Sequence, residues 1–349
     1  MKTKPRIPFP RFPQKLFRMA AIVLLILLCA YFLLVYFLVS AALVPSFMER
    51  LEAFERVTEE SYAAQVQTSD IKANRQAALQ ETREWLEHAR RQKHSIESAD
   101  GYTLVAEEFP AEGSAEGGHR WVLLLHGYTG WKEEMYPFAF WYHNQGFHVL
   151  APDLRCQGES GGDFIGMGWT DHFDCIQWLQ LILEWDPDAE IILHGQSMGA
   201  SAALILSGEL SGNSENTALA SHVRAVISDC AYTDAYAMFG EKIREWFGLP
   251  PFPLVDSACL VLRLRGGYDL KDASALAAVR QSQIPTLFIH GEADAMISVQ
   301  MTEELYRAAA CEKELLIVED AGHAQSQDKD PHTYYGKIEK FLDRVLANI

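Results

Sequence analysis

The sequence predicts an α/β fold, a mostly parallel β-sheet with helices on both faces, preceded by one membrane-spanning helix. Two observations carry this prediction. From about residue 94, short and continuously apolar runs alternate with helical stretches, a pattern typical of strands buried on both faces of a parallel sheet. Nearer the N-terminus, residues 19–44 contain no charged residue, and this run is far longer than a strand requires.

Residues 19–44 are the predicted membrane helix. As a helix, the run would be ~39 Å long, enough to cross a hydrocarbon core of ~30 Å with some tilt. The stub before it, residues 1–18, holds six basic residues and no acidic one, which favours a cytoplasmic N-terminus. We therefore expect a single-pass protein in which everything from residue 45 lies outside the cytoplasm.

Signal peptidase cleavage is the alternative to a retained anchor. Ser40 and Ala42 provide small residues at a suitable spacing for a cut after Ala42. The apolar run is much longer than the core of a cleaved signal, so we expect it to be kept.

The charge balance excludes one class of partner. The chain of 349 residues has a net charge of −17, and removing the six positive charges of the stub leaves −23 on the remainder. Because such an acidic body repels polyanions, we expect no nucleic-acid partner. The sequence does not indicate an oligomeric state.

Two regions follow the membrane helix. Residues 45–93 are polar, with apolar residues at roughly helical spacing, and predict a spacer of one or two amphipathic helices packed on the next domain. Residues 94–349 predict that domain. Its strands are predicted at 103–109, 121–127, 148–153, 191–195, 223–229, 286–291 and 315–320, with a glycine-rich turn at 113–118 and helices that include 171–185 and 302–310.

One connection in this domain is unusually long. More than fifty residues separate the strands at 223–229 and 286–291, which a simple crossover does not need. The insertion, about residues 233–280, is aromatic, apolar and interrupted by prolines. We predict a helical cap over the active site; an extra helix packed on the sheet is the alternative.

The nucleophile is predicted from the segment 195–199, Gly-Gln-Ser-Met-Gly. It joins an apolar strand to a helix of small residues, so Ser197 would lie on a strained turn whose neighbours must be glycine. The helix N-terminus would stabilise negative charge there. A second match to the same pattern surrounds Ser160, but it lies several residues beyond the strand ending at Asp153, and no apolar helix follows it. We therefore prefer Ser197.

A serine hydroxyl needs a base, which is usually a histidine oriented by a carboxylate. His323 follows the last predicted strand, in the order Ser, acid, His that this strand–turn–helix arrangement uses. Three other histidines, His126, His194 and His290, each end a strand before a glycine, and packing or turn roles suffice for at least two of them.

Asp294 is the predicted acid because it follows the penultimate strand. Three other acidic residues are alternatives. Asp229 ends the preceding strand, Glu292 precedes Asp294 by two residues, and Asp320 is too near His323 in sequence for an easy approach.

The backbone N–H groups of Met198 and Tyr128 are the predicted oxyanion donors, the first directly after the nucleophile and the second in the loop after the strand at 121–127. This chemistry requires no metal and no organic cofactor. The five cysteines after residue 45 are odd in number and irregularly spaced, which argues against a zinc site and a dense disulfide framework.

The segments LLLHGYTG, APDLRCQGESGG, GQSMG, FIHGEAD and AGH, in this order, resemble the α/β-hydrolase superfamily. Within it, residues 94–349 resemble the branch of serine aminopeptidase-like hydrolases and monoglyceride lipases, which includes membrane-anchored bacterial members. One departure is the pair Cys156-Gln157, where the branch commonly has Gly-His. Cys156 must then adopt a turn that glycine usually provides; a catalytic thiol is the less favoured interpretation.

The resemblance implies a serine hydrolase. We expect a carboxylesterase of the EC 3.1.1 type that cleaves lipid-like or small acyl esters through an acyl-enzyme on Ser197. A serine aminopeptidase is the alternative enzyme, with a peptide as substrate. An envelope protein that keeps the fold only for binding is the alternative from outside catalysis.

Overall fold

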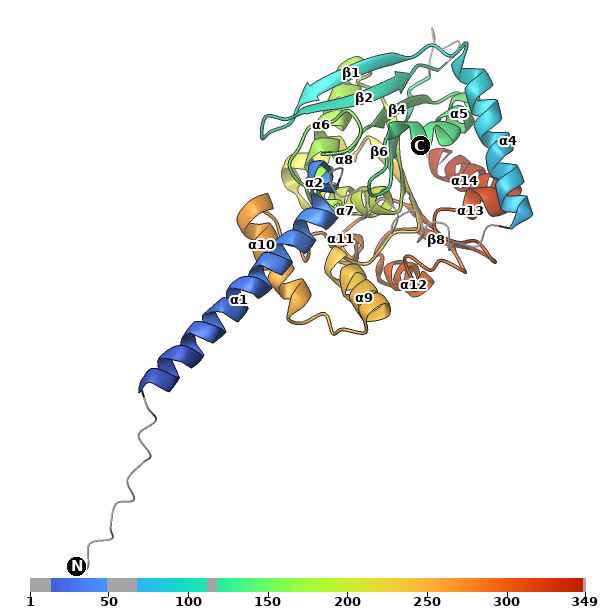
Figure 1. Ribbon diagram of the computed structural model, residues 1–349. Coiled ribbons are helices and arrows are strands. Elements are labelled where there is room, and N and C mark those ends of the chain that lie inside the picture. The colour runs from blue at the N-terminus through green and yellow to red at the C-terminus, as the bar shows by residue number, and fades with distance from the viewer. Residues whose placement is uncertain (1–13, 49–67, 112–117, 348–349) are drawn as a thin grey trace, which may run out of the picture.

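The computed structural model describes residues 14–48, 68–111 and 118–347, and centres on one eight-stranded sheet in the order β1-β2-β4-β3-β5-β6-β7-β8 (Figure 1). Strand β2 pairs antiparallel with β1 and β4, and every other pair is parallel. The mostly parallel α/β sheet is therefore confirmed. The strands are β1 (Gln92–Glu97), β2 (Thr103–Phe109), β3 (Arg120–Leu125), β4 (His148–Pro152), β5 (Glu190–Gln196), β6 (Val223–Asp229), β7 (Thr286–Gly291) and β8 (Lys313–Val318).

Strand β1 is the one strand that we did not predict. Its side chains alternate between exposed and half-buried after an exposed start, so the strand has no apolar run to reveal it. The seven predicted strands are all present, with ends within two residues of those expected. Most of the predicted turn at 113–118 lies outside the described residues.

The central strands are apolar throughout because each contributes to two cores. In β3, Leu123 and Leu125 belong to the core on one face, whereas Val122 and Leu124 belong to the core on the other. The first core is covered by α6 (Trp169–Trp185), α7 (Met198–Gly212), α11 (Ala275–Val279) and α12 (Val299–Ala308). The second is covered by α5 (Tyr136–Asn144) and α14 (Pro331–Leu346). The shorter helical segments are η2 (Lys132–Met135), η3 (Ser214–Asn216), α8 (Thr217–Ala220) and α13 (Ser326–Lys329).

The region between the N-terminal apolar helix and the sheet contains α2 (Pro45–Met48) and α4 (Ser69–Leu86), and residues 49–67 lie outside the described part. Helix α4 packs on the sheet domain. Its Trp85 ring lies 4.9 Å from the ring of Phe109, and Arg75 forms an ion pair with Asp328 at 2.7 Å.

The insertion between β6 and β7 contains α9 (Ala235–Phe247) and α10 (Leu254–Gly266), and α10 lies beside helix α1 (Gln14–Leu43), as Figure 1 shows. The third helix of this insertion, α11, packs instead on α7. Helix α1 is long and apolar enough to cross a membrane over Lys15–Leu43, a test of length and composition that a signal sequence or the core helix of a soluble protein also passes. Most of it extends away from the domain, but Val35, Val39 and Leu43 are buried.

Candidate active site

Ser197 lies on the turn between β5 and α7, with φ of 55° and ψ of −115°, a conformation that is strained for a residue with a side chain. Close backbone approach on both sides makes the flanking glycines necessary. A Cβ on Gly195 would lie 2.2 Å from the carbonyl oxygen of Gly199, and a Cβ on Gly199 would lie 2.1 Å from that of Leu125. The packing of β5, α7 and β3 thus holds the turn that the sequence predicts.

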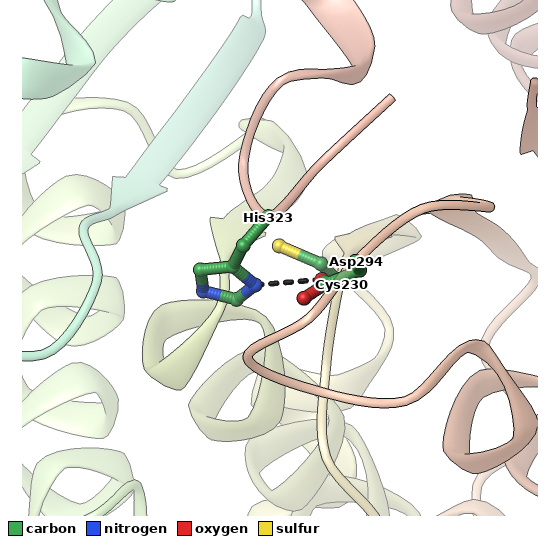
Figure 2. Close-up of side chains that lie close together, drawn as sticks. All are labelled: Cys230, Asp294 and His323. Carbon is green, nitrogen blue, oxygen red and sulfur yellow. Dashed lines mark hydrogen bonds and ion pairs between the residues drawn. The ribbon is translucent and has the colours of Figure 1, made fainter. Parts of the chain in front are cut away.

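The structure brings Ser197, His323 and Asp294 together. The His323 Nε2 lies 2.9 Å from the Ser197 Oγ, and its Nδ1 lies 2.7 Å from the Asp294 Oδ2. Figure 2 shows the His323 ring and Asp294 joined by this second bond. A carboxylate only accepts hydrogen bonds, so Nδ1 carries the proton and Nε2 accepts from the serine hydroxyl. His323 and Asp294 are both buried, and His323 is only 4% exposed.

Asp294 is held by more partners than His323 alone. Its Oδ1 accepts from the backbone N–H groups of Met296 and Ile297, both at 2.8 Å, and His290 Nε2 lies 3.1 Å from its Oδ2. Burial by itself would raise the pKa of Asp294, but attraction to the imidazolium form of His323 and the hydrogen bonds from His290 and His323 hold it well below its usual value. The carboxylate therefore stays ionised throughout the neutral and mildly acidic range.

Topology explains how three distant loops meet. Strands β5, β6, β7 and β8 are neighbours and parallel, so their carboxyl ends meet at one edge of the sheet. The loop that carries His323 passes directly over the end of β7, where a Cβ on Gly291 would lie 2.3 Å from the carbonyl oxygen of Ala321. The N–H of Ala293 donates to that same oxygen at 2.9 Å.

None of the three rival acids has this position. Glu292 and Asp320 are exposed. Asp229 is buried, but its Oδ2 accepts from Gln196 Nε2 at 3.2 Å and from the Tyr334 hydroxyl at 3.1 Å. Burial raises the pKa of Asp229 to about 6. Its main contribution near the nucleophile is through the backbone, where its carbonyl accepts from the N–H of Ser197 at 2.8 Å.

Two of the strand-ending histidines have structural partners. His126 Nδ1 donates to the carbonyl of Gly127, its Nε2 accepts from the N–H of Leu154 at 2.8 Å, and burial lowers its pKa to about 4. His194 lies between the hydroxyls of Tyr142 and Tyr334, and burial lowers its pKa to about 3. Both rings are therefore neutral at pH 7.

His290 is a residue of the site that sequence reasoning missed. Besides its contact with Asp294, its ring approaches the carbonyl of Ile297 at 2.9 Å and the hydroxyl of Thr302 at 2.7 Å. These partners fix the ring against the carboxylate. Its place four residues before Asp294 was the available signal.

The predicted oxyanion donors lie on two segments beside the nucleophile. Met198 is the first residue of α7, so its N–H has no acceptor within the helix. The loop after β3 runs close to Ser197, since a Cβ on Gly127 would lie 3.5 Å from the Cβ of Ser197. In this loop the Tyr128 hydroxyl donates to the carbonyl of Ala42, at the end of α1.

Ser160, in the second match to the glycine–serine–glycine pattern, has a different environment. It is buried, its hydroxyl donates to the carbonyl of Asp153 at 2.7 Å, and it accepts from the N–H of Val105 at 2.9 Å. Beside it, the buried Lys132 ammonium lies 2.7 Å from the Asp153 carboxylate. These hydrogen bonds and this ion pair give the loop of Ser160 a structural role.

Two cysteines raise the question of thiol or metal chemistry. Cys156 has φ of 66°, the conformation that glycine usually provides, and its thiol donates to the carbonyl of Gly162 at 3.2 Å. Burial raises its pKa to about 12, which disfavours a nucleophilic thiolate. Cys230 lies beside Asp294 and His323 with possible metal-ligand atoms within 4.8 Å (Figure 2). Burial raises its pKa well above the usual value, and His323 and Asp294 are already bonded to each other, so this donor set fits a triad better than a metal.

Comparison with known proteins agrees with this geometry. The model of the alpha/beta hydrolase family matches residues 122–334. The uncharacterized protein YqkD of Bacillus subtilis is 31% identical over 225 residues, which cover 64% of this chain and 71% of YqkD. The uncharacterized protein YfhR of Escherichia coli K12 is 27% identical over 251 residues, covering 71% of this chain and 78% of YfhR.

Solved structures share the fold at lower identity. The esterase Pf2001 of Pyrococcus furiosus superposes with a TM-score of 0.57 and 21% identity, covering 74% of this chain and 93% of the esterase. The family model, which matches more than half of the residues, and the parallel sheet lead to one conclusion. The chain belongs to the α/β-hydrolase family.

Proposed function

We propose that the protein is a membrane-anchored serine hydrolase that cleaves carboxylic esters, with Ser197 as the nucleophile. The observation that carries the proposal is the hydrogen-bonded series Ser197–His323–Asp294, with its distances of 2.9 Å and 2.7 Å. The strained backbone of Ser197 and the two constrained glycines beside it give further support, because such a turn presents the hydroxyl to a substrate.

In the proposed reaction, His323 Nε2 takes the proton of Ser197 as the Oγ attacks the ester carbonyl. Asp294 keeps the imidazole in the correct tautomer and stabilises its positive charge. The N–H groups of Met198 and Tyr128 stabilise the oxyanion. His323 then gives its proton to the leaving alcohol, and an acyl-enzyme remains on Ser197. Water, deprotonated by the same histidine, releases the acid and restores the serine.

An ester of the EC 3.1.1 type is the proposed substrate, either lipid-like or a small acyl ester. Three observations support it: the apolar insertion between β6 and β7, the apolar helix α1, and a structure of the same fold that is named an esterase. The narrower resemblance to monoglyceride lipases and serine aminopeptidases stays a prediction.

Helix α1 is proposed to remain attached and to span the membrane, with the hydrolase domain (94–349) outside the cytoplasm. The end of the helix supports retention because it packs within the domain. Ser40 and Ala41 are buried, and the N–H of Ile165 donates to the carbonyl of Leu43 at 2.9 Å. A cut after Ala42 would break the chain inside this packed region.

Activity-based labelling tests the nucleophile. A fluorophosphonate probe should label the full-length protein in detergent, and Ser197→Ala should abolish labelling while Ser160→Ala keeps it. Labelling that persists in Ser197→Ala and disappears in Ser160→Ala would overturn the assignment. No labelling of a folded wild-type protein would favour a binding role for the fold.

A substrate panel separates the two enzyme classes. Nitrophenyl esters of graded chain length and aminoacyl anilides should be compared on the same preparation. Turnover of the esters with little turnover of the anilides is expected, and the reverse ranking would identify a peptidase. For orientation, a fused reporter that is active only outside the cytoplasm should be active after residue 349.

A further inference from the structure

Exposed apolar side chains gather on one part of the hydrolase domain. From residue 69 onward, ten large apolar side chains in the described part of the chain are exposed, and six of them lie within residues 246–264. These six, named here the cap surface, are Trp246 (56% exposed), Phe247 (67%), Leu249 (50%), Phe252 (71%), Leu260 (45%) and Leu264 (79%). Residues 246–255 contain no charged residue. A patch of this kind marks an interaction site.

The cap surface is continuous with helix α1. The Tyr31 hydroxyl donates to the Ser257 Oγ at 3.0 Å near the start of α10, and Arg265 Nη1 donates to the Ser40 Oγ at 2.7 Å near its end. The Arg265 guanidinium also lies 4.0 Å from the centre of the Tyr36 ring. The two helices therefore run side by side in the same direction, with the start of α10 toward the N-terminal half of α1 (Figure 1).

This alignment fixes the level of α10 relative to a bilayer that α1 crosses. Arg18 is the last charged residue before the apolar run. A hydrocarbon core of ~30 Å that begins there ends near Leu38 at 1.5 Å per residue. Tyr31 then lies ~10 Å inside the far boundary, and Ser257 lies beside it. The start of α10, three residues before Ser257, and the loop before it, with Phe252, then fall within the hydrocarbon region, ~10–15 Å inside its far boundary.

The charged groups around α10 suit this placement. Arg263 and Arg265 belong to its last turn, near Ser40, which is the level of the headgroups. Asp256 lies near the deeper end, but it forms an ion pair with Lys271 at 3.1 Å and accepts from the Tyr236 hydroxyl at 2.9 Å. The apolar start of α10 therefore lies at the level of the acyl chains, and its basic last turn lies at the level of the headgroups.

We propose that the cap surface enters the outer leaflet of the bilayer beside α1, so that the hydrolase domain is held on the lipid by two attachments. This proposal rests on the proposed membrane anchoring. It assigns the exposed side chains a partner, the acyl chains of the lipid, and it places the insertion between β6 and β7 where acyl esters of the bilayer are present.

Depth-dependent quenching tests the proposal on the full-length protein. An environment-sensitive nitrobenzoxadiazole label would be attached to single cysteines in phosphatidylcholine nanodiscs that contain a lipid with a nitroxide near the headgroup or near the end of the acyl chain. Cys29, which is native and exposed on α1, reports on the anchor. Cys156 and Cys311, the two half-buried cysteines, would be serine throughout, and Cys29 would be serine when another site is labelled.

The labelled variants are Phe252→Cys and Leu264→Cys, with Leu79→Cys as a matched control. Leu79 is also an exposed leucine, but it lies on α4, on the side of the domain away from α1 (Figure 1). We expect lipid nitroxides to quench Phe252→Cys and Leu264→Cys about two-fold or more, with Phe252→Cys the deeper of the two, and to leave Leu79→Cys unchanged.

The outcomes separate the proposal from the anchoring on which it rests. Quenching of Cys29 together with Phe252→Cys supports both. Quenching of Cys29 while Phe252→Cys and Leu264→Cys behave like Leu79→Cys overturns the cap surface and keeps the anchor. An unquenched Cys29 overturns the anchoring, and the cap surface with it.

Discussion

Two segments of this chain share the same pattern of glycine, any residue, serine, any residue, glycine, and the structure uses them in opposite ways. Ser197 lies on a left-handed turn between a strand and a helix, with its hydroxyl bonded to His323. Ser160 lies in a loop, and its hydroxyl donates to the backbone carbonyl of Asp153 and accepts from the backbone N–H of Val105. We propose that the first serine reacts with substrate, whereas the contacts of the second are structural.

The difference teaches that the surroundings determine what the pattern means. The glycines around Ser197 are needed because strand β5, helix α7 and the end of β3 approach one another closely. Near Ser160, Gly158 is constrained by a side chain and not by backbone, since a Cβ there would lie 2.3 Å from the carboxylate of Asp153. The five-residue pattern alone cannot distinguish these two situations. A strand directly before the pattern and a helix directly after it do distinguish them.

The largest expected effect is a difference in kcat between variants of the two serines. Ser197→Ala should lower kcat on a nitrophenyl ester at least ~10⁴-fold, because the nucleophile is lost. Ser160→Ala, assayed as the folded protein, should keep kcat within about ten-fold of the wild type. Steady-state kinetics on both variants checks this, and equal losses in the two would contradict it.

The next effect concerns the two buried carboxylates near Ser197. Asp294→Asn should lower kcat by ~10³–10⁴-fold, because the amide no longer fixes the tautomer of His323 or stabilises its charge. Asp229→Asn should cost about ten-fold or less, since its carboxylate contacts Gln196 and Tyr334 instead. If Asp229→Asn proved the more damaging in kcat, the choice of acid would be wrong.

Around Ser160, the expected damage is to stability. Asp153→Asn should lower the free energy of unfolding by about 3–5 kcal/mol, because Lys132 would keep a buried charge without its closest partner. Glu159→Gln is the matched control: Glu159 also bonds Lys132, at 2.8 Å, but its side chain is 50% exposed, so a change of about 1 kcal/mol or less is expected. Denaturant titration in detergent measures both.

A smaller loss is expected for Ser160→Ala itself. Removing the hydroxyl leaves the buried N–H of Val105 without its acceptor, which should lower the free energy of unfolding by about 1–3 kcal/mol. Ser197→Ala should leave stability unchanged or raise it slightly. Thermal unfolding of the two variants side by side would show whether structure and reaction are divided in this way; a larger loss in Ser197→Ala would reverse the assignment.

The smallest effect depends on pH. The pKa of Asp229 is raised in the folded state to about 6, so between about pH 4 and 6 the folded protein holds a proton that the unfolded chain releases. Stability should therefore fall as pH rises through this window and change no further above it. Asp229→Asn lacks this titration, so the advantage of this variant over the wild type in free energy of unfolding should grow by about 2 kcal/mol from pH 4 to 7. An advantage that shrinks as pH rises would show that the pKa is lowered instead.

Much of the fold could be predicted because its determinants are local. Continuous apolar runs mark the strands that are buried on both faces, and the strand before Ser197 distinguishes it from Ser160. Strand β1 could not be found this way, because it lies at an exposed edge and its side chains show no apolar run. Pairs that join distant loops, such as Lys132 with Asp153, leave no periodic trace in the sequence either.

Helix α1 shows a further limit of prediction from the sequence. Every position from 19 to 44 is uncharged, so nothing in the sequence separates the part of α1 that extends away from the domain from the part that packs on it. The structure shows the difference: Val35, Val39 and Leu43 form a buried stripe at intervals of four residues, whereas Leu33 and Leu34 are exposed. A uniformly apolar helix has no polar face from which its contacts could be inferred.

Mapping the labelled residue tests the central claim, that Ser197 is the nucleophile, most directly. Trypsin is unsuitable, because no lysine or arginine lies between Arg155 and Arg224 and both serines would share one peptide. Cleavage after glutamate separates them, giving peptides 160–184 and 191–209. After reaction with a fluorophosphonate, mass spectrometry should find the added mass on peptide 191–209, with fragmentation placing it on Ser197. The added mass on peptide 160–184 would contradict the claim.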